Sequence, residues 1–95
     1  MEAKLIVVGG KAKAEQFDLK LPAIVGRSRS ADLPLNHPLV SRQHCELFEA
    51  NGKLWVRDLG SLNGTTVNGA KIKDHLLADG DLIGVAAVAI RFEAS

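Results

Sequence analysis

The sequence predicts an all-β fold, either a sandwich or a barrel built from many short strands. Apolar and polar residues alternate strictly in residues 16–21, which is the period of a half-buried strand. Turn signals made of Gly, Asn, Asp and Pro recur every few residues and bound each run. Almost no stretch shows the period of an amphipathic helix. We therefore expect roughly ten short strands.

The first half of the chain offers four of these strands, at residues 4–8, 16–21, 23–25 and 33–35. The first is a β-branched run that stops at two glycines. Pro22 separates the second strand from the third, which ends at Gly26-Arg27. Pro34 confines the fourth to the edge of a sheet, because proline cannot donate a hydrogen bond to a neighbouring strand.

The second half predicts strands at residues 43–50, 53–57, 65–67, 71–72, 82–85 and 88–92. Asn51-Gly52 and Asn68-Gly69 are tight-turn signals, since such turns need positive φ at both central positions. Asp79-Gly80-Asp81 marks another turn. In a sandwich, the loops between such strands gather at its two ends, where a rigid scaffold presents their side chains.

The length of 95 residues predicts one domain over residues 1–95, large enough for a core without metal or disulfide support. The formal net charge of +1 argues against broad binding to nucleic acid or to a membrane surface. Cys45 is the single cysteine, which fits a reducing compartment. There is no signal peptide and no apolar run of about 18 residues. We expect a cytoplasmic monomer.

Polar residues suited to an anion cluster at three of the predicted strand ends. Arg27 and Arg42 carry planar guanidinium forks that match a phosphate or carboxylate, and Ser41 adds a hydroxyl donor. Asn63 can donate and accept at once, as holding a peptide main chain requires. If the loops converge, the ligand they fit is a phosphorylated, extended peptide.

Each of these residues also has a plainer structural interpretation. Arg27 could be a solvated surface arginine, and Ser41 could cap a turn. Gly26 could serve a bend or a close backbone approach. An imidazole at the position of His44 can bond a backbone group and hold the loop, while Asn63-Gly64 could be only a turn. No single signal is specific by itself.

Taken together, the order G-R at 26–27, S-x-x-H at 41–44 and N-G at 63–64 resembles the forkhead-associated (FHA) domain family. The resemblance runs from about residue 24 to residue 92. It implies a β-sandwich of about eleven strands (FHA/SMAD-like) that binds phosphothreonine peptides through loops at one end; arginine clusters serve this family in phosphate recognition. By similarity, Arg27 and Ser41 contact the phosphate with Arg42 beside it, and Asn63 holds the peptide backbone.

The resemblance also implies secondary roles. Gly26, His44 and Gly64 would support the loops, Asn68 would brace the loop near Asn63, and Ser61 and Leu62 would be possible secondary contacts. Arg29 has no fixed role in the family; as a possible secondary contact it could extend the positive surface. Leu62 departs from the family, which often has Thr or Ser before Asn-Gly; it costs one hydrogen bond or lines a pocket for the threonine methyl group. Leu39 and Val40 favour an apolar residue three places after the phosphothreonine.

The sequence predicts no enzyme, no cofactor and no metal site. It has no Ser/His/Asp order with an oxyanion hole, no paired cysteines or H-E-x-x-H, and no P-loop. The expected partner is a phosphothreonine protein, either a Ser/Thr kinase substrate or an autophosphorylated kinase, read for signalling or assembly. The alternative is a β-scaffold that binds proteins independently of phosphorylation.

Overall fold

Eleven strands form the regular structure in the computed structural model, which describes residues 2–8 and 15–94. They are β1 (Glu2–Val7), β2 (Glu15–Lys20), β3 (Ala23–Gly26), β4 (Leu33–Pro34), β5 (Cys45–Ala50), β6 (Lys53–Asp58), β7 (Thr65–Val67), β8 (Ala70–Ile72), β9 (Asp74–Leu76), β10 (Leu82–Val85) and β11 (Val88–Glu93). Neither described range contains a helix, and so neither has one able to cross a membrane. The predicted all-β class is confirmed.

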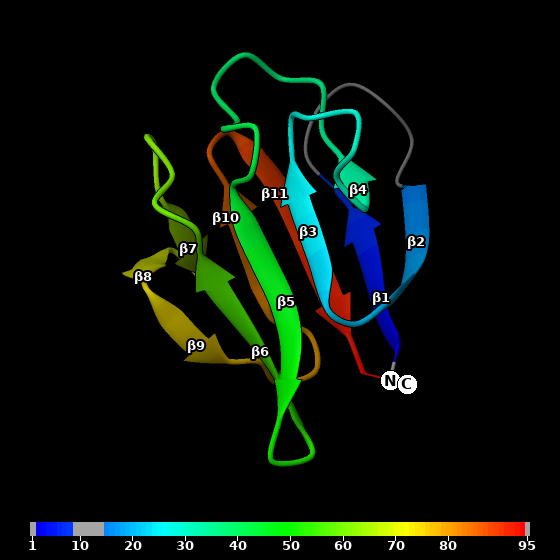
Figure 1. Ribbon diagram of the computed structural model, residues 1–95. Coiled ribbons are helices and arrows are strands. Elements are labelled where there is room, and N and C mark those ends of the chain that lie inside the picture. Colours follow the sequence, from blue (N-terminus) through cyan, green and yellow to red (C-terminus); the bar gives the residue numbers. More distant parts are fainter. Residues whose placement is uncertain (1, 9–14, 95) are drawn as a thin grey trace.

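The strands form two sheets packed face to face as a sandwich (Figure 1). One sheet has six strands in the order β2-β1-β11-β10-β7-β8, and the other has five in the order β4-β3-β5-β6-β9. The strand pairs with a described register are antiparallel, except that β3 and β4 run parallel. Pro34 lies in β4 at the edge of its sheet, as its missing N–H predicts.

The core lies between the sheets and is filled by alternate residues of the strands. Leu5 of β1, Leu47 of β5, Val56 of β6 and Ile90 of β11 are all buried there. Among the Phe and Trp side chains of the described residues, Phe92 alone is fully buried, so branched aliphatic side chains dominate the packing. Close packing of this kind makes a stiff support for the loops at the ends of the strands.

The loops sort to opposite ends of the sandwich (Figure 1). The β3–β4, β4–β5 and β6–β7 loops lie toward the upper end in this view, and they contain the Arg27, Ser41 and Asn63 segments. The β5–β6 turn lies at the lower end. The sandwich therefore carries the three predicted motif segments on one side.

The tight turns form as predicted. Asn51 and Gly52 have φ of 55° and 73°, and Asn68 and Gly69 have φ of 52° and 87°. These left-handed values are those that the hairpin turns demand at their two central residues. Each turn connects two antiparallel neighbours, β5 with β6 and β7 with β8.

Some strand boundaries differ from the sequence prediction. β9 was not predicted, although Trp55, Val56 and Arg57 of β6 pair with it. β5 begins at Cys45 rather than at residue 43, although the His44 backbone still bonds Val25 of β3 and Leu59 just after β6. β1 begins at Glu2 rather than at residue 4.

Candidate functional site

Backbone hydrogen bonds join the end of β3 to the segment that precedes β5. The Arg27 N–H donates to the Ser41 carbonyl at 2.9 Å, and the Ser28 N–H donates to the Arg42 carbonyl at 3.2 Å. Gly26 makes this approach possible, since a Cβ on Gly26 would lie 2.0 Å from the Arg42 carbonyl oxygen. Gly26-Arg27 and Ser41-Arg42, which the sequence assigned to one site, are therefore neighbours in space.

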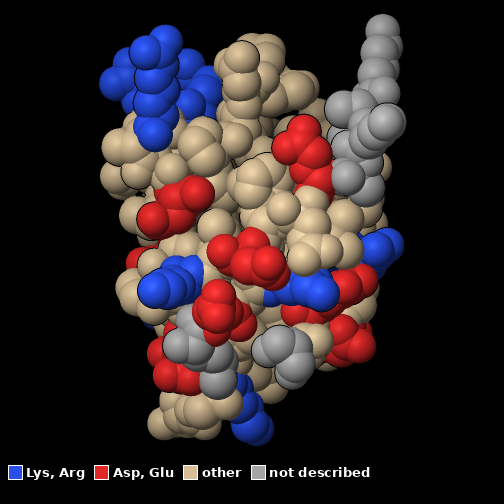
Figure 2. All heavy atoms as spheres, turned by 90° about the vertical axis from the view of Figure 1, so that its right-hand side faces the viewer, with Lys and Arg blue, Asp and Glu red and all other residues tan. Residues whose placement is uncertain are grey.

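Three arginines, Arg27, Arg29 and Arg42, are exposed on these loops. Arg27 donates from Nε to the Val40 carbonyl at 3.0 Å, which orients the guanidinium and leaves its Nη groups for a ligand. Figure 2 shows lysine and arginine side chains gathered at the upper end of the molecule. Asp32 of the β3–β4 loop accepts from the Ile24 N–H instead of pairing with an arginine.

None of these three arginines forms an ion pair with a residue in the described ranges. The ion pairs there are Arg57–Asp74 and Arg91–Glu93, both on strands. Unpaired guanidinium groups on adjacent loops repel one another and attract an anion. The loop end is thus locally positive in a chain whose formal net charge is only +1.

His44 connects the Ser41 segment to the β6–β7 loop from a fully buried position. Its Nδ1 accepts from the Ser41 N–H at 3.1 Å, so the proton of the neutral ring is on Nε2, which donates to the Gly64 carbonyl at 2.8 Å. The backbone of His44 also donates to the Val25 carbonyl and accepts from the Leu59 N–H. One residue thereby ties together three segments that meet at the site.

Asp58 organises the β6–β7 loop from the end of β6. Its Oδ1 accepts from the hydroxyls of Ser61 and Thr65, and its Oδ2 accepts from the N–H groups of Gly60 and Ser61 at 3.0 and 3.1 Å. Partial burial acts to raise the pKa of Asp58, but these hydrogen bonds outweigh it and hold the pKa below its usual value. Ser61 also accepts from the Gly64 N–H, which closes the loop.

Two further hydrogen bonds join the β4–β5 and β6–β7 loops at the surface. The Leu62 N–H donates to Ser41 Oγ at 3.1 Å, and Asn63 Nδ2 donates to the Leu39 carbonyl at 2.7 Å. The Ser41 hydroxyl keeps its own proton to donate outward. Asn63 keeps its second N–H and its carbonyl oxygen. The structure therefore brings Arg27, Ser41 and Asn63 into one connected set of loops with free polar groups.

Two expectations drawn from the resemblance need correction. Asn68 does not brace the loop near Asn63: its Nδ2 donates to Asp81 Oδ1 and its Oδ1 accepts from the Leu82 N–H, both at 2.9 Å, so it fixes the β7–β8 turn to β10. Val40 is buried in the core and cannot face a ligand. Leu39 is 50% exposed and Leu62 is 89% exposed, so both present apolar surface at the loop end.

The importance of Asp58 was not predicted, although the sequence carries a signal for it. An aspartate three residues before a serine commonly bonds that serine and the intervening backbone, and Asp58 and Ser61 have this spacing. Cys45 lies close by in β5 and is fully buried. Burial and the nearby charge of Asp58 raise the pKa of the Cys45 thiol to about 12, so it is a packing residue.

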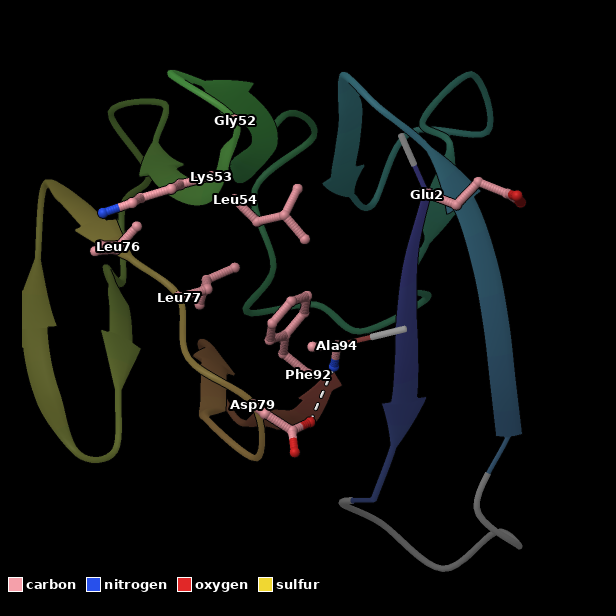
Figure 3. A pocket seen from close by; sticks show the side chains of 9 residues that line it. All are labelled: Glu2, Gly52, Lys53, Leu54, Leu76, Leu77, Asp79, Phe92 and Ala94. Carbon is pink, nitrogen blue, oxygen red and sulfur yellow. Dashed lines mark hydrogen bonds between the residues drawn. The ribbon is translucent and has the colours of Figure 1, made fainter.

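A separate cavity of about 340 Å³ lies near the β5–β6 turn, away from the three loops (Figure 3). Leu54, Leu77 and Phe92 form its apolar wall. Asp79 lines one side and accepts from the Ala94 N–H at 2.9 Å. No arginine lines this cavity, so it lacks the groups that the predicted phosphate site requires.

A two-sheet sandwich with arginine, serine and asparagine side chains on joined loops is a scaffold for binding, with its polar groups at one end. The chain belongs to the FHA domain family, whose family model matches residues 23–86. It is 35% identical over 91 residues to the glycogen accumulation regulator GarA of Mycolicibacterium smegmatis, an alignment covering 95% of this chain and 58% of that protein.

Two other proteins show how widely this similarity extends. The ABC transporter ATP-binding/permease protein Rv1747 of Mycobacterium tuberculosis is 37% identical over 68 residues, which is 72% of this chain and 8% of that protein. An FHA domain solved in work on phosphothreonine-dependent FHA domain interactions superposes with a TM-score of 0.85 at 32% identity, covering 100% of this chain and 98% of that one. The chain thus spans between 8% and 58% of these two curated relatives.

Proposed function

We propose that the loop end of this domain binds phosphothreonine peptides and thereby reads marks left by a serine/threonine kinase. The observation that carries the proposal is the joined pair of loops: Ser41 Oγ accepts from the Leu62 N–H, Asn63 Nδ2 donates to the Leu39 carbonyl, and Ser41 and Asn63 each keep a free donor. Arg27 and Arg42 flank this pair without an acidic partner in the described ranges. Work on phosphothreonine-dependent interactions of a similar FHA domain supports the same ligand class.

Each side chain has a role that its free groups allow. The Arg27 Nη groups and the Ser41 hydroxyl donate to the phosphate oxygens, and Arg42 adds positive charge beside them. Asn63 holds the peptide backbone with its remaining N–H and its carbonyl oxygen. Arg29 extends the positive surface, while Gly26, His44 and Gly64 hold the loops in register. Ser61 supports the β6–β7 loop, because Asp58 and the Gly64 N–H occupy its hydroxyl.

The affinity that follows is moderate. A charge-assisted hydrogen bond contributes about 1.5–3 kcal/mol, and three or four of them offset several kcal/mol for ordering a flexible peptide. At the upper end of this range, subtracting about 4 kcal/mol leaves a net free energy of up to roughly 8 kcal/mol, so the Kd should be micromolar or weaker. Because the loop end is exposed, salt screens the attraction and the affinity falls as ionic strength rises.

The geometry supports a binding module rather than an enzyme. Both ring nitrogens of His44 are engaged by backbone groups of Ser41 and Gly64, so the ring is not placed to take a proton from the Ser41 hydroxyl. The Ser41 oxygen accepts from the Leu62 N–H instead. We propose a single domain over residues 1–95 that acts in the cytoplasm as a monomer, with a kinase substrate or an autophosphorylated kinase as its partner.

The test is isothermal titration calorimetry with matched phosphothreonine and unphosphorylated peptides from an oriented library. Arg27→Ala should weaken phosphopeptide binding at least about tenfold, since it removes a charge-assisted contact of about 1.5–3 kcal/mol. Arg91→Ala is the matched control, because Arg91 is an exposed arginine on β11, outside the site. Its affinity for the same peptide should equal that of the wild type.

Phosphoserine and phosphotyrosine peptides complete the comparison. Equal binding of phosphorylated and unphosphorylated peptides would exclude the proposal and favour a scaffold that binds independently of phosphorylation. Equal phosphopeptide affinity of the wild type and Arg27→Ala would exclude the role given to Arg27. Circular dichroism of each variant, with the wild-type β-sheet spectrum as reference, separates these outcomes from a loss of folding.

A further inference from the structure

Lys71 lies against the β6–β7 loop, although it is eight residues beyond Asn63 in the chain. It is exposed on β8, opposite Thr66 of β7. A Cβ on Gly64 would lie 3.1 Å from Lys71 Cε and 3.7 Å from Lys71 Nζ. The lysine stem therefore covers Gly64, and its ammonium group lies beside the loop that carries Asn63. Figure 1 shows β8 next to β7 and below this loop.

The charge of Lys71 is not neutralised within the described ranges. The ion pairs there involve Arg57 and Arg91, and Lys71 is in neither. A lysine of this kind buries its methylene stem on apolar or backbone surface and keeps its ammonium in water. The ammonium is then available to an anionic group brought to the same place.

Gly64 links Lys71 to the phosphate side of the site. Its carbonyl accepts from His44, and His44 accepts from the Ser41 N–H. The residue before it, Asn63, is the one assigned to the peptide backbone. An extended peptide advances about 3.3 Å per residue. A peptide held at Ser41 and Asn63 thus brings a side chain within reach of Lys71 only a few residues from its phosphothreonine.

We propose that Lys71 is a specificity-determining residue that selects peptides with an anionic side chain, either a carboxylate or a second phosphate, close to the phosphothreonine. This inference rests on the proposed function, because the peptide must first be held by the arginines and Asn63. Lys71 adds a second, separate positive group beside Gly64. The sandwich would then read two anionic groups at a fixed separation along one peptide.

The test is a scan of aspartate through the three positions on each side of the phosphothreonine, in an otherwise neutral peptide. Fluorescence anisotropy at low salt should show that aspartate at one position, or at two alternate positions, strengthens wild-type binding about two- to fivefold, the range of an exposed ion pair. Phosphoserine at the same position should strengthen it further. Raising the salt to about 0.5 M should remove most of the gain.

Three variants separate charge from packing. Lys71→Met keeps a long stem over Gly64 and should abolish the aspartate gain while binding the neutral phosphopeptide as the wild type does. Lys71→Arg should keep the gain, and Lys71→Glu should reverse it so that lysine is preferred at that position. Lys53→Met is the matched control, since Lys53 is an exposed lysine beside the cavity near the β5–β6 turn; it should keep the full gain.

The outcomes distinguish this inference from the function on which it rests. If the neutral phosphopeptide binds but no aspartate position strengthens binding, or if the gain persists in Lys71→Met, the role of Lys71 is wrong and the proposed function stands. If Lys71→Met weakens the neutral and aspartate peptides equally, the lysine only supports the loop. If no phosphothreonine peptide binds the wild type above its unphosphorylated control, both proposals fall.

Discussion

Replacing His44 tests whether one buried imidazole holds the two ligand loops together. His44→Phe keeps a ring in the same space but removes both of its nitrogens. The Ser41 N–H and the Gly64 carbonyl then lose their partners, which lie at 3.1 and 2.8 Å in the native protein. A buried polar group left without a partner costs about 1–3 kcal/mol, so the variant should lose about 2–6 kcal/mol of unfolding free energy.

Urea denaturation followed by tryptophan fluorescence measures this loss, with Trp55 as the reporter. Two further variants, each keeping one of the two hydrogen bonds, should lose only part of this unfolding free energy. His44→Asn can still accept from the Ser41 N–H but does not reach Gly64, while His44→Gln can still donate to Gly64. Each should be less stable than the wild type and more stable than His44→Phe.

His75→Phe is the matched control, because His75 is a partly buried histidine on the edge strand β9 and makes no side-chain hydrogen bond within the described ranges. It should change the unfolding free energy by less than about 0.5 kcal/mol. Phosphopeptide affinity should fall at least about tenfold in His44→Phe under conditions where it remains folded. A His44→Phe variant as stable as His75→Phe would refute the bridging role of the imidazole.

Three more predictions follow from the loop geometry. Gly26→Ala should lower the free energy of unfolding by more than about 1 kcal/mol and weaken phosphopeptide binding, because its Cβ would lie 2.0 Å from the Arg42 carbonyl oxygen. Thermal unfolding measures the loss, and an unchanged melting temperature would contradict the close approach. Asp58 has a lowered pKa in the fold, so its contribution to stability is present above its unfolded pKa of about 4 and is lost as pH falls through the lower folded value. Asp58→Asn should therefore be less stable than the wild type at pH 7 and should lose less unfolding free energy as the pH falls. Urea titrations of both proteins from pH 7 to pH 2 would show this, and unfolding free energies that fall in parallel with pH would count against it. Cys45, with a pKa raised to about 12, should resist a thiol reagent at pH 8 in the native protein and react once urea unfolds it; labelling of the native protein at the rate of a free thiol would disprove its burial.

Local signals in the sequence predicted most of the fold. Strict alternation located β2, and the Asn-Gly pairs located two hairpins, because both signals depend only on residues next to one another. β9 was missed because Asp74-His75-Leu76 has no alternation or β-branched run, and it forms a strand only through its pairing with β6. Tertiary context of this kind leaves no mark within a three-residue window.

The candidate site was predictable where motif residues bond the backbone nearby. The interpretation of His44 as a residue that holds a loop backbone agrees with its bonds to Ser41 and Gly64. The contact between Lys71 and Gly64 could not be predicted, because it depends on how β8 pairs with β7 rather than on either sequence segment. Asn68 was assigned to the wrong neighbour for the same reason: Asp81 and Leu82 reach it only once β10 lies beside β7.

The backbone hydrogen bonds that fasten residues 27 and 28 to residues 41 and 42 have a kinetic consequence. Because they hold the ligand loops in one arrangement before the peptide binds, the entropy lost on complex formation falls mainly on the peptide and little on the protein. Association should then need no slow isomerisation, and its observed rate constant should rise linearly with peptide concentration without levelling off. Stiffening the peptide, for example by a proline that favours its extended form, should lengthen the residence time of the complex more than any further stiffening of these loops could.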